Sequence, residues 1–257
     1  MNQAHPQLPL PAPDAKPAEW LASRLSNVGT NWVTATVGAG WPAYARIFHP
    51  LDDTVDALRW SSVAAANGRT MYPAAQWEVI SSNRSVPGGP RGRGFPGAPE
   101  LGHLNQRSLS AVCQLLAPHT TTAEQCWFAL WDGRAWMHAA GASMMPKPSR
   151  DSTAVTLAPR QLDLSAPRFA LPYRSYYLFG GALQDAVRLG YWVTADSFRP
   201  QSPNLMWPND HAWCLASEID FDTTLVGGSR QLISDLTASP RLEVLAISPT
   251  HALEVAE

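Results

Sequence analysis

The sequence is poor in charge and in cysteine. Only 16% of its 257 residues are charged, and 19 Lys and Arg against 21 Asp and Glu leave a formal net charge of −2. Binding a phosphate backbone needs a basic surplus, so this composition argues against nucleic acid as a partner. The three cysteines, Cys113, Cys126 and Cys214, are widely spaced and form no CxxC pair, which argues against a disulfide framework and a zinc knuckle. We expect three buried thiols that act as small apolar side chains.

Long hydrophobic runs are also missing. No window approaches the roughly 18 apolar residues of a transmembrane helix, so we predict that the chain does not insert into a membrane. Residues 1–17 contain five prolines and lack the positive end and the apolar run of a secretory signal. The sequence therefore predicts a cytoplasmic protein whose residues 1–17 form a disordered, proline-rich tail.

The sequence contains no recognisable catalytic centre. Its seven histidines form no HxH, HxxxH or HExxH pattern, so the signatures of zinc hydrolases are absent. GxSxG and Walker A sequences are absent as well. Gly92, Gly94 and Gly97 have GxGxxG spacing, but they lie in a proline-rich stretch and not between a strand and a helix, as a dinucleotide-binding site requires. The absence of these patterns leaves open a catalytic cysteine–histidine pair whose two residues lie far apart in the sequence.

The residues that are present predict an α+β protein. Hydrophobic residues make up 45% of the chain, enough for a sizeable core, while 23 Pro and 17 Gly indicate many loops. Apolar residues recur at helical spacing over 101–117, and residues 213–221 alternate as a strand does. The Asp132-Gly133 pair between two β-rich runs predicts a tryptophan-rich hairpin near 126–138. We expect an antiparallel or mixed β-sheet with helices packed mainly on one face.

The chain length fits one large domain or two small ones. Residues 86–99 read VPGGPRGRGFPGAP, and so much glycine and proline excludes regular structure there. We therefore predict a single globular domain over 18–257, with a mobile loop at 86–99 that could mark a subdomain boundary. Whether residues 18–85 form a separate subdomain stays open at this stage.

The densest group of unusual residues is SPNLMWPNDHAW at 202–213. Rigid loops beside sheets often carry binding residues, and tryptophan offers a flat apolar surface with one hydrogen-bond donor. Trp207, Asp210 and Trp213 are therefore candidate partner-binding residues. The alternative is that both tryptophans belong to the core and that Asp210 caps a turn.

Three carboxylates lie in the strand predicted over 213–221 and directly after it. Glu218, Asp220 and Asp222 stand at alternate positions, so they would project from one face of it. Such a stripe could bind Mg²⁺, Ca²⁺ or Mn²⁺, which prefer oxygen ligands, or form an acidic surface. We favour the surface because no second element supplies converging ligands. Glu218 and Asp220 thus join the predicted partner-binding set, and no metal or other cofactor is predicted.

Four segments of the chain resemble an uncharacterised family of actinobacterial proteins. They are YARIFHP (44–50), HTTTAEQCWFALWDG (119–133), LPYRSYYLFGG (171–181) and SPNLMWPNDHAWCLASEIDFDTTLVGGS (202–229). The last segment is the most specific, through its WPxDxxW…EID arrangement. The resemblance implies a bacterial source but no activity. A looser similarity, in the order of the elements, is to the SUKH superfamily of immunity and interaction proteins, whose α+β folds carry aromatic-rich, non-catalytic binding surfaces.

These features predict a non-catalytic protein-interaction module of immunity or regulatory type. Its aromatic and acidic surface, formed by Trp207, Asp210, Trp213, Glu218 and Asp220, would bind a protein and attract a basic one. The alternative is an enzyme or small-ligand-binding protein with Asp210 or Glu218 as general acid or base, and a third is a structural or oligomeric role. An enclosed cleft with a buried Glu218 would favour the enzyme, and an open aromatic and acidic face the partner.

Overall fold

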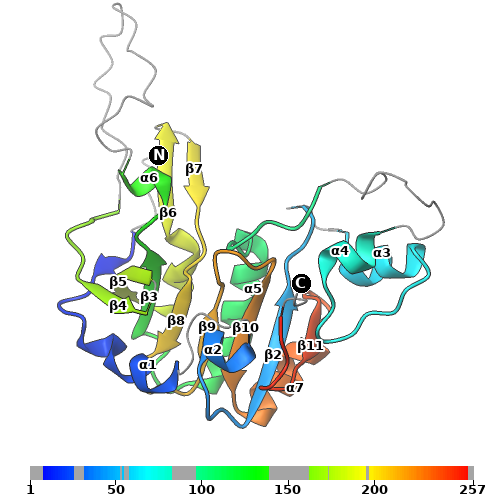
Figure 1. The fold of residues 1–257 in the computed structure, drawn as a ribbon. Helices are drawn as coiled ribbons and strands as arrows, with labels where there is room; N and C mark the ends of the chain where they lie inside the picture. The colour runs from blue at the N-terminus through cyan, green and yellow to red at the C-terminus, as the bar shows by residue number, and fades with distance from the viewer. Residues whose placement is uncertain are drawn as a thin grey trace, which may run out of the picture.

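The computed structural model of the protein describes residues 8–25, 32–52, 54, 58–82, 97–138, 162–172, 174–194 and 197–253. A central β-sheet of nine strands carries helices on its faces, which confirms the predicted α+β fold class (Figure 1). Among the described helices, none has both the length and the apolar character needed to cross a membrane.

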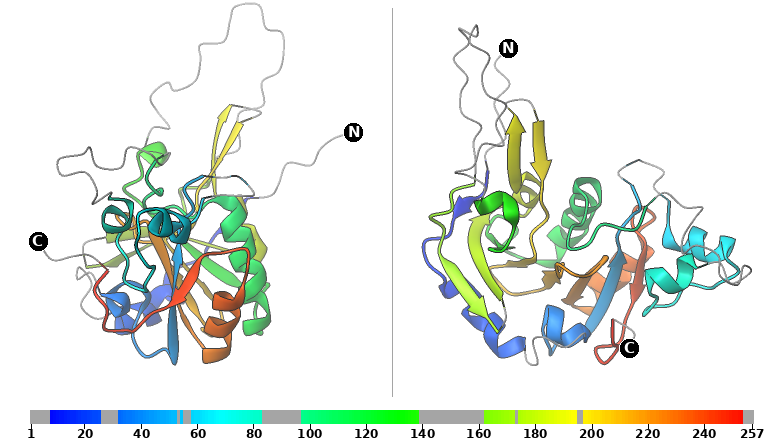
Figure 2. Two further views of the ribbon diagram at one scale, coloured as in Figure 1. Left: turned by 90° about the vertical axis from the view of Figure 1, so that its right-hand side faces the viewer. Right: turned by 45° about the horizontal axis from the view of Figure 1, so that its top comes forward.

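The central sheet is built from strands that are distributed along most of the chain. In chain order they are β1 (Leu10–Pro11), β2 (Ala43–Phe48), β3 (Cys126–Trp131), β4 (Arg168–Leu171), β5 (Arg174–Gly181), β8 (Leu205–Pro208), β9 (Cys214–Ala216), β10 (Thr223–Gly228) and β11 (Val244–Ala246). Their order in the sheet is β1-β5-β3-β8-β9-β10-β2-β11, and β4 also pairs with β5. All of these pairs are antiparallel. A separate hairpin of β6 (Gly190–Thr194) and β7 (Ser197–Pro200) projects from the body (Figures 1 and 2).

The two longest described helices pack on one face of the sheet, as predicted. These are α5 (Gln106–Leu116) and α7 (Arg230–Ala238), and each begins with a capping side chain. Asn105 accepts a hydrogen bond from the backbone N–H of Ser108 (2.8 Å), and Ser229 accepts one from Leu232 (3.1 Å). The shorter helices α1 (Glu19–Arg24) and α2 (Val33–Val37) cover the other face, where α2 lies in front of the sheet in Figure 1.

The remaining helices are short. They are α3 (Trp60–Ala66), α4 (Trp77–Ser81), α6 (Ala135–His138) and the 3₁₀ helices Lys16–Ala18, Ala117–His119 and Leu183–Arg188. Helices α3 and α4 lie beside the edge formed by β2 and β11 (Figure 2). Their buried side chains, with Phe48 and Trp60 among them, form a small core of their own.

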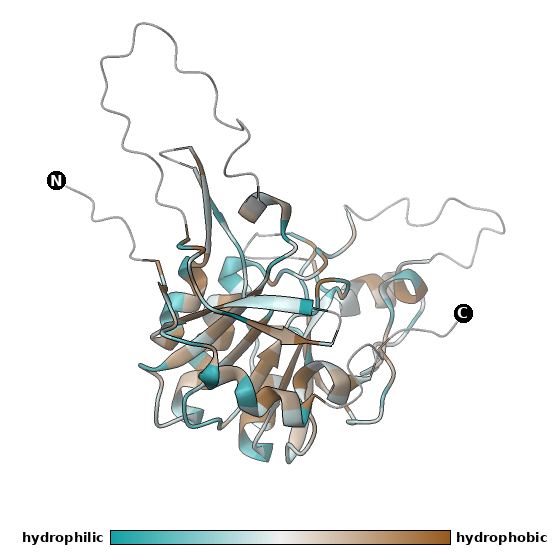
Figure 3. Ribbon diagram, turned by 60° about the vertical axis from the view of Figure 1, so that its left-hand side comes forward, coloured by the Kyte–Doolittle hydropathy of each residue, from teal (hydrophilic) through white to brown (hydrophobic). Residues whose placement is uncertain are grey.

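Alternation along the strands divides the main core into two layers. In β3, Cys126, Phe128 and Leu130 face the layer under α5 and α7, whereas Trp127 and Trp131 face the layer under α1 and α2. Because both layers are apolar, the strands are mainly hydrophobic in Figure 3. The sheet is therefore the rigid frame that positions polar side chains at its two ends.

The predicted hairpin near 126–138 needs correction. Cys126–Trp131 is a strand, and Asp132 and Gly133 form a turn, but Ala135–His138 is the helix α6. The strand β3 pairs instead with β5 on one edge and β8 on the other. With both of its edges occupied by strands distant in the sequence, β3 has no edge left for a local partner.

The predicted tail 1–17 is also shorter than expected. Leu10 and Pro11 pair with Gly180 and Phe179 as strand β1, and Leu8 is buried in the core. Residues 8–17 therefore belong to the fold, and residues 1–7 lie outside the described residues. The same holds for most of the predicted loop 86–99, of which only 97–99 is described. Strand β2 lies between β10 and β11, so the chain before residue 86 forms part of the central sheet.

Candidate functional site

The two predicted contact tryptophans are core residues. Trp207, in β8, and Trp213, just before β9, are both 0% exposed. They lie on opposite faces of the sheet, because Trp207 belongs to the layer under α1 and α2 and Trp213 to the layer under α5 and α7. Neither side chain can contact a partner at the surface, so both are corrected from binding residues to packing residues.

Asp210 fastens the turn between β8 and β9. Its carboxylate accepts hydrogen bonds from the backbone N–H of Thr121 (2.7 Å) and of Ala212 (3.2 Å) and from the hydroxyls of Thr120 (2.8 Å) and Thr121 (2.9 Å). Burial acts to raise the pKa of Asp210, but the hydrogen bonds from Thr121 and Thr120 outweigh it and the pKa is lowered. Asp210 is exposed, yet its oxygens already serve to hold this loop rigid.

The next residue begins a chain of aromatic contacts across the sheet. His211 has a φ of 53°, and its exposed ring stacks on Trp20 of α1 at 4.3 Å between centroids. Trp20 contacts the buried Trp207 edge-on at 6.1 Å. Trp207 contacts Phe169 at 6.3 Å, and Phe169 stacks on Tyr176 at 5.4 Å. These rings connect the end of the sheet that carries His211 to the opposite end.

Large aromatic side chains also stand half-buried along this chain of contacts. We call this surface the aromatic face, and its members are Trp20, Trp41, Trp127, Trp131 and Phe169. They come from α1, from the segment before β2, and from β3 and β4. Large apolar groups that stay partly in water on one face of a sheet often mark a contact surface.

The predicted acidic stripe is divided in the structure. Strand β9 ends at Ala216, and the next residues turn, with the N–H of Phe221 donating to the carbonyl oxygen of Glu218 (3.1 Å). The turn brings Glu218 and Asp220 to Arg174 of β5, whose Nη2 lies 2.8 Å and 2.9 Å from their carboxylate oxygens. Asp222 instead has its Oδ1 atom 3.7 Å from Nη2 of Arg46.

Arg174, Glu218 and Asp220 form a charged cluster at one end of the aromatic face. The guanidinium of Arg174 lies 5.6 Å from the ring centroid of Trp131. Burial raises the pKa of Glu218, while Arg174 acts in the opposite direction. Burial also raises the pKa of Tyr176, and the nearby Glu218 adds to that effect. Asp220 keeps 67% of its side chain exposed and so remains accessible.

Asp210 and Glu218 cannot act together as an acid and a base. Strands β8 and β9 are antiparallel, with Leu205 opposite Ala216, so the turn with Asp210 lies at one end of the sheet. Glu218 follows Ala216 at the other end. Among the described residues, no group of histidines, cysteines or carboxylates is arranged to hold a metal ion.

A pocket of about 250 Å³ lies elsewhere, between the segment after β2 and the segment that leads into α5. It is lined by Pro50, Leu51, Asp52, Ala98, Glu100, His103 and Asn105. No local sequence pattern predicts it, because its two walls are loops some fifty residues apart (His49 to Glu100 spans 51 positions).

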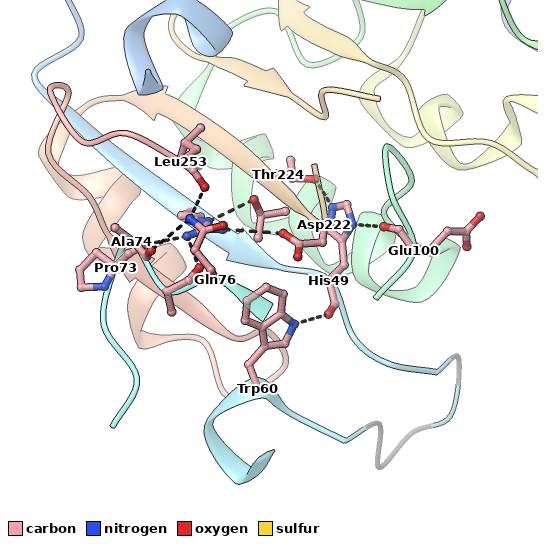
Figure 4. Close-up of polar contacts among 12 residues, drawn as sticks. His49, Trp60, Pro73, Ala74, Gln76, Glu100, Asp222, Thr224 and Leu253 are labelled. Atoms are coloured by element: carbon pink, nitrogen blue, oxygen red, sulfur yellow. Dashed lines mark hydrogen bonds and ion pairs between the residues drawn. The ribbon is translucent and has the colours of Figure 1, made fainter. Parts of the chain in front are cut away.

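Beside this pocket, His49 belongs to a buried hydrogen-bond chain (Figure 4). Its Nδ1 lies 2.7 Å from the carbonyl oxygen of Glu100, and its Nε2 lies 2.8 Å from the Thr224 hydroxyl. A carbonyl oxygen only accepts, so Nδ1 carries the proton and Nε2 accepts from Thr224. Thr224 in turn lies 2.6 Å from the Ser217 hydroxyl. Burial lowers the pKa of His49 to about 4, which keeps the imidazole neutral.

Arg46 is the second buried ionisable group in this region. Its Nη1 donates to the carbonyl oxygens of Pro73 (3.1 Å) and Ala75 (2.7 Å), and its Nε donates to the Thr223 hydroxyl (3.1 Å). Burial lowers the pKa of Arg46 to about 10, with Asp222 acting against that. Arg46 therefore fastens the loop before α4 onto the sheet, and both Arg46 and His49 are buried.

Gly102 holds the segment before α5 against the turn that carries Glu218. Its N–H donates to the carbonyl oxygen of Phe221 (2.8 Å), its φ is +62°, and a Cβ there would lie 2.5 Å from the Cα of Ile219. We expect Gly102→Ala to lower the free energy of unfolding by about 1–3 kcal/mol, because it adds a backbone clash to a strained conformation. Urea denaturation followed by circular dichroism measures this.

Gly68→Ala is the matched control. Gly68 has a φ of +67°, but a Cβ there would meet no heavy atom within 4 Å, so only the left-handed conformation costs energy, about 1 kcal/mol. Equal losses in the two variants would show that the close approach to Ile219 does not constrain residue 102.

Comparison with known proteins finds no match: no family model fits the sequence, and neither a curated protein nor a solved structure is significantly similar to the chain. The function is therefore inferred from the residues of the chain itself.

Proposed function

We propose that the protein is a non-catalytic interaction module that binds a protein partner through the aromatic face. The observation that carries the proposal is the set of five half-buried Trp and Phe side chains on one face of the sheet, with an arginine near each end. Tryptophan, tyrosine and arginine are the residues that most often dominate the energy of protein interfaces. An immunity or regulatory role in the cytoplasm is part of this proposal.

The charged cluster gives the face a way to select its partner. Asp220 is exposed and shares Arg174 with Glu218, so a cation on a partner can approach its free oxygen. Rim charges of this kind mainly change the rate of association and exclude partners of the wrong sign. A basic residue on the partner would therefore be placed opposite Asp220.

The enzyme alternative has less support from the geometry. Asp210 is held by four hydrogen bonds, and Glu218, at the opposite end of the sheet, is paired with Arg174. The pocket of about 250 Å³ is lined by neither residue. Half-buried aromatic side chains outside any pocket agree better with a protein partner than with a small substrate.

A capture experiment with a charge reversal tests the proposal. We expect the immobilised wild-type protein to retain one protein in stoichiometric amount from a lysate of its native host. Asp220→Lys should reduce that capture at least tenfold, because it repels the basic residue and breaks the pair with Arg174. Quantitative mass spectrometry measures the retained protein, and circular dichroism checks that the variant is folded.

The matched control is Asp235→Lys. Asp235 is also a partly exposed aspartate with a side-chain partner, but it lies on α7, on the opposite face of the sheet, where its carboxylate lies 2.9 Å from Nε2 of His119. Its reversal should leave capture unchanged. If wild type retains no stoichiometric protein, or if both reversals reduce capture equally, the aromatic face is not the binding surface.

A further inference from the structure

The end of the aromatic face opposite the charged cluster contains an arginine in an unusual setting. The guanidinium of Arg24 lies 4.5 Å from the ring centroid of Trp41 and 5.5 Å from that of Trp20. The two rings are perpendicular, with centroids 6.2 Å apart. Arg24 is therefore placed in a corner with two aromatic walls, and a cation over a ring face is stabilised by the ring electrons.

This arginine lacks a counter-ion within the described residues. No carboxylate there lies within ion-pair distance of Arg24, whose single polar side-chain contact in that part of the chain is a long one, 3.5 Å from Nη1 to the carbonyl oxygen of Ala39. A guanidinium has five N–H donors in a planar fork that matches a carboxylate. The described residues thus use little of the hydrogen-bonding capacity of this half-buried side chain.

Asp210, an acidic side chain in the loop beside Trp20, does not fill that role. Asp210, next to His211 in the loop that stacks on Trp20, directs its oxygens to Thr120, Thr121 and Ala212. Burial lowers the pKa of His211 and the charge of Arg24 lowers it further, against the opposite effect of Asp210, so a second cation is disfavoured beside Arg24. Among the residues that the structure describes, Arg24 is thus the strong anion-binding group at this corner.

The corner is also rigid. The Trp41 ring lies directly against β10, since a Cβ on Gly227 would come within 2.2 Å of it, and its Nε1 donates to the carbonyl oxygen of Val37 (3.1 Å). The backbone of Arg24 is fixed by the N–H of Ala39, which donates to its carbonyl oxygen (2.8 Å). A group held in place before binding loses little entropy when a ligand arrives.

We propose that Arg24, between Trp20 and Trp41, binds a carboxylate of an acidic protein segment. This deepens the proposed function and rests on it, because the acidic segment is the part of the partner that lies at this end of the aromatic face. The other end carries the exposed carboxylate Asp220. With opposite charges at its two ends, the face accepts a partner in one orientation only.

Titration with defined peptides tests the site without the natural partner. In the ¹⁵N-labelled full-length protein, the indole Nε1 signals of Trp20 and Trp41 are assigned with the variants Trp20→Phe and Trp41→Phe. We expect hexaglutamate to shift both signals and to saturate, while hexalysine shifts neither. Arg24→Gln should weaken the binding of hexaglutamate at least tenfold, since it removes charge-assisted hydrogen bonds.

Arg230→Gln is the matched control, because Arg230 is an exposed arginine on α7 on the opposite face of the sheet. It should bind hexaglutamate as the wild type does. The inference is overturned if hexaglutamate leaves the Trp20 and Trp41 signals in place, if inorganic phosphate shifts them at lower concentrations than the peptide does, or if Arg24→Gln binds equally well.

The variant Arg24→Gln also separates this inference from the proposed function. If the lysate yields a partner whose capture depends on Asp220 but not on Arg24, the interaction module stands and the carboxylate site fails. If hexaglutamate binds through Arg24 while no partner is captured, the carboxylate site stands and the protein-interaction function fails.

Discussion

Arg46→Ala should lower the free energy of unfolding by about 3–5 kcal/mol. The substitution removes three donated hydrogen bonds, and it leaves Asp222 and the carbonyl oxygens of Pro73 and Ala75 without their cation. Uncompensated polar groups in a low-dielectric interior cost more than a lost surface contact. The guanidinium also packs over Phe48 at 4.9 Å, so a cavity adds to the loss. Urea denaturation at pH 7 measures the change.

Two further variants show whether the lost stability comes from the hydrogen bonds of Arg46 or only from the volume of its side chain. Arg46→Lys keeps the charge but lacks the planar fork, so it should recover less than half of the loss. Arg241→Ala removes an exposed arginine with one side-chain bond, to Gln114, and should change stability by no more than about 0.5 kcal/mol. If Arg46→Ala costs under about 1 kcal/mol, the loop before α4 does not depend on Arg46.

The sequence located regular elements where an apolar period was strong and a capping signal was present. Residues 101–117 were predicted to be helical, and α5 occupies Gln106–Leu116. The first five residues are excluded from the helix because Asn105 caps it and Gly102 takes a positive φ. Leu104 is buried all the same, so an apolar side chain at helical spacing can reach the core from an extended segment.

The sequence predicts the candidate site only in part, because the residues that meet there lie far apart along the chain. The alternation over 213–221 continued past the true strand end at Ala216, and nothing local marks the turn that follows. Glu218 and Asp220 do lie together, but through Arg174, which lies 46 positions before Asp220. Pairings of this kind follow from sheet order, and a single sequence does not contain that order in readable form.

The burial of the tryptophans likewise depends on segments that are distant in the sequence. Trp207 and Trp213 are compatible with a surface or with a core, and the helices that cover each face of the sheet place both in the core. The burial of Arg46 and His49 has no sequence signal, because arginine is mostly exposed in proteins and histidine is intermediate. Their burial depends on loops that come from 73–75 and from residue 100.

His49 should make the protein less stable in mild acid. Its pKa is about 4 in the folded protein against an ordinary value of 6.5, because burial penalises the charged imidazole. Between these two values the unfolded chain binds a proton that the folded chain does not. Lowering the pH from 6.5 to 4 therefore favours unfolding, and the stability lost to this one group is on the order of 3 kcal/mol. Above pH 6.5 and below pH 4 the group adds no further slope.

His49→Gln isolates this contribution from the other titrating groups, since Glu218 and Asp210 also have shifted pKa values. Glutamine does not titrate, so the free energy of unfolding of the variant should fall less steeply than that of wild type between pH 6.5 and 4. Urea titrations of both proteins at a series of pH values from about 7 to about 4.5 give the two slopes. Equal slopes would mean that the folded protein accommodates the imidazolium. The acceptor role of Nε2 toward Thr224 would then have to be abandoned, while Nδ1 would keep its proton, because both nitrogens of a doubly protonated ring donate.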